Sequence, residues 1–145
     1  MTKRIEHEGR LLALLIPGSF NEPGIHFFTE NDLSQQLAFM QHPEGKVIQA
    51  HVHKPVKREI HYTQEVLILR KGKLRVDFYQ DDQTYLESHI LSAGDIILLV
   101  EGGHGFKVLE PIEMFEIKQG PFVPEQDKVK FHGIEDHQVE IPDNQ

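Results

Sequence analysis

Short apolar or alternating runs, each closed by turn residues, follow one another along most of this chain. Sustained periodicity of 3.6 residues is almost absent, whereas short runs between turn residues are typical of β-strands. We therefore expect strands at residues 11–16, 25–29, 36–41, 46–53, 65–70, 73–80, 85–91, 95–100, 105–110 and 113–119. So many short strands predict an all-β sandwich or barrel, in which a jelly roll would close the strand edges.

The residues between these runs predict the turns. Gly72 in the stretch RKGK can adopt a positive φ angle, which predicts a tight hairpin between residues 65 and 80. A second tight turn is expected at QDDQT, residues 80–84. At most one short helix is expected, at residues 31–37, where Asn31 or Asp32 could cap a single turn.

The length and composition bound the organisation of the chain. Its 145 residues suit one domain that can bury a core without disulfides, and the sequence contains no cysteine. After Phe131 the composition changes to the acidic stretch HGIEDHQVEIPDNQ. We expect one domain over residues 1–131 and a C-terminal tail, residues 132–145, that packs poorly or reaches a neighbouring subunit.

Charge and hydropathy narrow the range of partners. The formal net charge of -8 disfavours nucleic acids and anionic membranes, because Lys and Arg drive both associations. No apolar run reaches the roughly 20 residues of a membrane span, and the N-terminus lacks the pattern of a signal peptide. We expect a soluble, cytoplasmic protein with no nucleic-acid or membrane partner. Apolar residues exceed the needs of one inner layer, which predicts a homodimer.

The placement of the histidines suggests a metal site. Side chains alternate between the two faces of a strand, so His51 and His53 would share one face of the predicted strand 46–53. The same alternation would place Glu65 and His104 on the apolar inner faces of two other strands. A same-face histidine pair also occurs on surface strands, so the pair by itself does not identify ligands.

Two motifs resemble those of the cupin superfamily. The first reads GKVIQAHVH at residues 45–53 and continues as EVLILRKG at residues 65–72, and the second reads GDIILLVEGGH at residues 94–104. The resemblance spans about residues 45–108 and implies a small single-domain cupin with a double-stranded β-helix fold. It also implies four metal ligands, which are His51, His53, Glu65 and His104.

The sequence departs from the family pattern in three ways. The insert KPVKREIHYTQ, residues 54–64, is longer than the family's usual gap, so His61 could replace Glu65 or His53 as a ligand. In the second motif, Val100 stands where the family has proline, and one residue is missing between Gly102 and His104. The insert also carries the candidate substrate-binding residues Lys57, Arg58, His61 and Tyr62, although a solvated loop is the simpler interpretation.

Imidazoles and a carboxylate suit a divalent ion such as Fe, Mn, Zn, Ni or Co, and they leave coordination positions open. We therefore expect a metal-binding cupin acting on a small polar metabolite, such as an anionic or sugar-like molecule or an acid. If it is an enzyme, a metal-dependent isomerase or epimerase, or an Fe(II) dioxygenase, fits best. A non-catalytic sensor or accessory module that binds a metal or a small-molecule ligand is the alternative.

Overall fold

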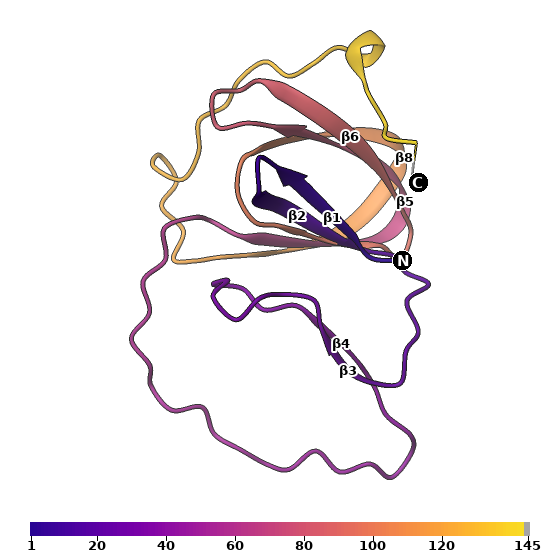
Figure 1. Ribbon diagram of the computed structural model, residues 1–145, viewed down its shortest axis with the longest axis vertical. Helices are drawn as coiled ribbons and strands as arrows, with labels where there is room; N and C mark the ends of the chain where they lie inside the picture. The colour runs from indigo at the N-terminus through magenta and orange to yellow at the C-terminus, as the bar shows by residue number, and fades with distance from the viewer. Residues whose placement is uncertain (144–145) are drawn as a thin grey trace.

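The computed structural model describes residues 1–143 and shows an all-β protein (Figure 1). Its strands are β1 (Lys3–His7), β2 (Arg10–Ile16), β3 (Gly24–Phe27), β4 (Ala38–Gln41), β5 (Glu65–Tyr79), β6 (Tyr85–Ser92), β7 (Ile96–Leu99) and β8 (Gly103–Lys118). One 3-10 turn, η1 (Asp136–Gln138), follows them. The described residues contain no α-helix and no helix long and apolar enough to cross a membrane.

Six of these strands form one curled antiparallel sheet. Its order is β1-β2-β7-β5-β6, and β8 pairs with β5 along the opposite edge. The first part of β5, Glu65–Ile68, pairs with β7, whereas its last part, Lys73–Tyr79, pairs with β6. The strand β8 follows β5 over both parts. Figure 1 shows this sheet rolled around its own interior, with the β3–β4 hairpin beside it.

The long strand β5 bends at Gly72. The expected hairpin there is wrong, because the two predicted runs form one continuous strand. The expected positive φ angle is present at +85°, and the pairing of β5 with β8 shifts register between Leu69 and Leu74. A glycine with positive φ inside a strand is typical of a bulge, which bends the strand without ending it. In the same way, two predicted runs merge into β8.

Two apolar clusters lie on opposite faces of the sheet. The interior of the curl is filled mainly by Ile5, Leu12, Leu15, Leu67, Leu69, Leu74, Val76, Phe78, Leu91, Ile97 and Leu99. The outer cluster contains Leu14, Val66, Leu98 and Val100, packed against Phe28, Leu33 and Leu37. Leu67 and Val66 show the alternation directly, because neighbours along β5 belong to different clusters.

Several sequence predictions agree with the structure and two others do not. The strands expected at 11–16, 25–29, 36–41, 85–91 and 95–100 correspond to β2, β3, β4, β6 and β7. The turn at QDDQT is confirmed, with Gln80 N–H donating to Thr84 O at 2.8 Å. The helix expected at 31–37 is absent, since these residues form turns and bends, and β1 was not expected.

The strand expected at residues 46–53 is wrong for the single chain. Residues 42–64 contain no strand, and residues 43–62 are all exposed. In Figure 1 this segment runs along the bottom of the molecule, away from the sheet, between β4 and β5. A strand needs a neighbour to pair its backbone, and residues 47–63 form no backbone hydrogen bond with any described strand.

The C-terminal segment is hydrogen-bonded to the sheet at residues 134–140, although none of these residues is buried. Ile134 N–H donates to the hydroxyl of Tyr79 at 3.0 Å, and Glu140 N–H donates to that of Tyr85 at 2.9 Å. The carbonyl of Glu140 accepts a hydrogen bond from Ser88 N–H at 2.8 Å. The two final residues, 144 and 145, lie outside the described part of the chain.

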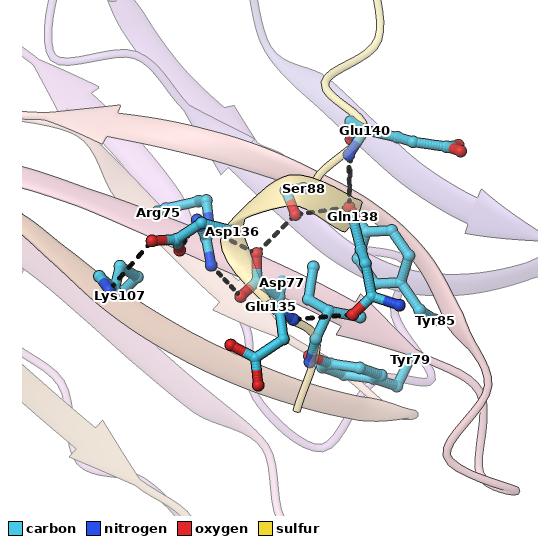
Figure 2. A network of polar contacts seen from close by, with 11 residues as sticks. Arg75, Asp77, Tyr79, Tyr85, Ser88, Lys107, Glu135, Asp136, Gln138 and Glu140 are labelled. Carbon is cyan, nitrogen blue, oxygen red and sulfur yellow. Dashed lines mark hydrogen bonds and ion pairs between the residues drawn. The ribbon is translucent and has the colours of Figure 1, made fainter. Parts of the chain in front are cut away.

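A buried ion pair anchors this segment, as Figure 2 shows. The guanidinium of Arg75 donates to both carboxylate oxygens of Asp77, at 2.8 and 3.1 Å, and both side chains are less than a tenth exposed. Asp136 adds a contact to Arg75 at 3.0 Å and one to Lys107 at 3.4 Å. The hydroxyl of Ser88 donates to Asp77 as well. One acidic residue of the tail, Asp136, thus pairs with two basic groups on the sheet.

Candidate functional site

Glu65 and His104 meet at one end of the curled sheet. Glu65 begins β5 and His104 lies near the start of β8, where their ladder partners are Lys118 and Phe78. These two positions are at opposite ends of the β5–β8 ladder, but the curl brings them together. His104 Nε2 lies 3.4 Å from a carboxylate oxygen of Glu65. The predicted inward alternation also holds at both positions, because Glu65 alternates in phase with Leu67 and His104 pairs with Phe78.

Charged groups surround the Glu65 carboxylate, whose side chain is 12% exposed. Lys118 Nζ lies 3.8 Å from its second oxygen and 2.7 Å from Asp127, which accepts a hydrogen bond from Thr63 at 2.8 Å. The hydrogen bond from His104 lowers the pKa of Glu65, and this effect and the nearby lysines outweigh the opposing effect of burial. An ionised carboxylate beside an imidazole is therefore present at neutral pH.

A cavity of about 910 Å³ opens beside this pair. Its lining comes from four parts of the chain, residues 61–65, 75–83, 100–107 and 116–136. Carboxylate, imidazole and ammonium groups project into or border this space, and Phe106 and Phe131 contribute apolar surface. A cavity of this size, with a few convergent polar groups, suits a small metabolite.

His51 and His53 lie apart from this site. Both are exposed in the segment between β4 and β5, with ring centroids 5.2 Å apart. A ring nitrogen of His51, Nδ1, lies 2.9 Å from the carbonyl of Gln49. Within the described part of the chain, no three His, Cys, Asp or Glu side chains are grouped so that they could hold a metal ion. One chain thus brings together two of the four predicted ligands, Glu65 and His104.

The four predicted substrate-binding residues separate into two pairs. His61 and Tyr62 are exposed but line the cavity, so they can reach a molecule bound there. Lys57 and Arg58 are exposed in the same segment and do not border the cavity. His61 Nε2 is 4.0 Å from Glu59 in an exposed contact. The groups that contact the Glu65 carboxylate are His104 and Lys118, not His61.

Sequence reasoning missed Lys118 and Asp127. Both lie after the region that resembles the cupin motifs, and no short-range pattern marks them. Only the antiparallel register, which sets Lys118 opposite Glu65, reveals the relation. The only signal in the sequence is that a basic residue, Lys118, lies at the end of one predicted strand and an acidic residue, Glu65, at the start of another.

A scan of family models, a search of curated proteins and a search of solved structures each found no match to this chain. The fold and the site therefore define the class. It is an all-β protein whose curled antiparallel sheet places a carboxylate and an imidazole beside a cavity.

Proposed function

We propose that this protein is a metal-binding cupin that acts on a small polar metabolite at an open His/Glu site. The observation that carries the proposal is the meeting of Glu65 and His104, which come from two strands and lie 3.4 Å apart beside the cavity. They are two of the four residues that the resemblance to cupins implies as ligands. The curled sheet supports the corresponding fold, a double-stranded β-helix.

Glu65 and His104 would hold a divalent ion, and His51 and His53 would complete the ligand set. Carboxylate and imidazole donors suit Fe, Mn, Zn, Ni or Co. When bound, such an ion would polarise a carbonyl or hydroxyl group of the metabolite or acidify a water. Lys118 compensates the charge of Glu65, while Tyr62 and His61 offer hydrogen bonds to polar groups in the cavity.

A non-catalytic binding module would use the same residues, and one observation favours it. Tyr79 is a candidate general acid or base in the cavity wall, but its hydroxyl already accepts the hydrogen bond of Ile134 N–H. Burial also raises the pKa of Tyr79, so its hydroxyl stays protonated at neutral pH. This tyrosine is thus a poor base, so a general base would have to come from another residue of the cavity, such as His61.

Metal analysis tests the proposal. The protein, incubated with Mn²⁺ or Zn²⁺ and freed of excess ion, should retain stoichiometric metal by mass spectrometry. His104→Gln and Glu65→Gln should each lower metal affinity at least about tenfold, since each removes one of few ligands. The exposed His132, whose ring nitrogen lies 3.0 Å from Glu135 and which does not line the cavity, provides the matched control His132→Gln. Absence of metal from the wild type would refute the proposal.

The same preparations separate an enzyme from a binding module. Turnover of a panel of sugars, sugar phosphates, hydroxy acids and keto acids would identify an enzyme, and oxygen consumption with Fe²⁺ would identify an oxygenase. Saturable binding of a panel member without turnover would identify the non-catalytic module.

A further inference from the structure

The inner face of β8 is exposed where its ladder partners on β5 are buried. Val76 and Leu74 are 0% exposed, whereas Phe106 and Val108, which lie directly opposite them, are 41% and 52% exposed. Directly opposed residues of an antiparallel pair point to the same side of the sheet. Phe106 and Val108 therefore face the interior of the curl, and nothing in the described chain covers them fully.

The outer edge of β8 is also unpaired. This strand has 16 residues and pairs with β5 alone among the described strands. A long edge with exposed apolar side chains offers a row of free N–H and C=O groups to another strand. The exposed inner face and the unpaired edge both belong to β8. One additional strand beside β8 could therefore pair with its edge and cover its inner face.

The same chain also contains an unpaired segment with the sequence pattern of a strand, which we call the free strand (residues 46–53). Residues 47–63 make no backbone–backbone hydrogen bond to any described residue, and the side chains of Val47, Ile48, Val52 and Val56 are at least 60% exposed. The sequence of residues 46–53 alternates as a strand does, although the single chain leaves it in solvent. Both ends of the segment are fixed, since Gln41 pairs with Gly24 and Gln64 O accepts a hydrogen bond from Gln119.

We infer that residues 46–53 pair as a strand with the free edge of β8 in a second copy of this chain. Each copy presents one unpaired strand and one unpaired edge, so a two-fold dimer satisfies both reciprocally. The occupant is a second copy because the segment leads away from its own sheet while its two ends remain anchored (Figure 1). This exchange of strands between two copies would cover Phe106 and Val108 and remove Val47, which lies on the strand face of His51, from water.

The exchange of strands also explains why a single chain brings together only two of the four proposed metal ligands. This step rests on the proposed function. Val47, Gln49, His51 and His53 share one strand face. With that face turned inward, His51 and His53 of one copy lie near the mouth of the other copy's curl, where Glu65 and His104 meet. Each metal site would then take residues from both chains.

Complementation between two variants tests the shared site. One chain carries His51→Ala and His53→Ala, and the other carries Glu65→Gln and His104→Gln. Each pure variant should bind no Mn²⁺ or Zn²⁺, whereas the heterodimer, purified through two different tags after joint refolding, should bind one ion per dimer. A heterodimer without metal, beside a wild type that binds it, would overturn the shared site and leave the proposed function intact.

A second experiment tests the exchange without metal. Ile48→Pro removes a backbone donor from the free strand, and because Ile48 is exposed in the single chain, the fold should survive. Sedimentation should show a wild-type dimer, at least a tenfold weaker dimer for Ile48→Pro, and a nearly unchanged dimer for the matched Ile48→Thr, which keeps a β-branched side chain. A monomeric wild type, or equal dimerisation of both variants, would overturn the inference.

Discussion

Substituting Gly72 by alanine should destabilise the fold strongly, because this glycine sits at the bend of β5. Its φ angle is +85°, a region in which an L-residue with a Cβ costs about 1–2 kcal/mol. An added Cβ would also lie 2.8 Å from the carbonyl carbon of Pro111 and closer still to its oxygen. Both atoms belong to the backbone of β8, so relief of the overlap requires the two strands to shift.

The sequence contains a matched control at Gly9. This residue has a similar φ angle of +76° but no atom within 4 Å of an added Cβ. Gly9→Ala should therefore cost only the conformational term, about 1 kcal/mol. Gly72→Ala should cost about 3 kcal/mol or more, since the strain of the displaced ladder adds to that term.

Urea unfolding followed by far-ultraviolet circular dichroism gives both free energies by linear extrapolation. If Gly72→Ala and Gly9→Ala cost the same, the close approach of β8 to Gly72 does not constrain the fold. Gly72 lies in the strand that begins at Glu65, so under the proposed function metal affinity should fall with Gly72→Ala and stay unchanged with Gly9→Ala.

Three further predictions concern the C-terminal segment. Asp77→Asn should lower the free energy of unfolding in urea by about 3 kcal/mol, because Arg75 keeps a buried charge without its main partner, and a loss below about 1 kcal/mol would contradict this. Hydrogen bonds from Arg75 and Lys107 lower the pKa of Asp136, so its contribution is present above the ordinary pKa and lost as the pH falls through the lowered one. Wild type should therefore lose more stability on acidification than Asp136→Asn, and equal pH profiles would refute the link. Deleting residues 134–145 should lower the melting temperature in calorimetry, since the hydrogen bonds to β5 and β6 are lost; an unchanged value would show that the segment only rests on the sheet.

The strand positions and faces could be predicted because they depend on local alternation. The phases of Glu65 and His104 follow from counting along their own strands, and the structure places both on the inner face. Their contact could not be predicted in the same way. It depends on the curl of the β5–β8 ladder, which brings together residues from opposite ends of that ladder.

Two errors have one physical origin. Gly72 was expected to end a strand, and residues 46–53 were expected to form one. A positive φ angle is compatible with both a hairpin and a bulge, and alternation is compatible with both a paired and an unpaired segment. The choice depends on backbone partners distant in sequence, which local pattern does not specify.

The sequence by itself determined the all-β class, the absence of cysteine chemistry, most strand positions, and the residue types offered to a site. The tertiary structure decided which of those residues meet, since it placed Glu65 against His104 and Lys118 and left His51 and His53 in solvent. The physical reason is that side-chain direction is a property of each strand, whereas convergence requires register, bending and closure of the whole sheet.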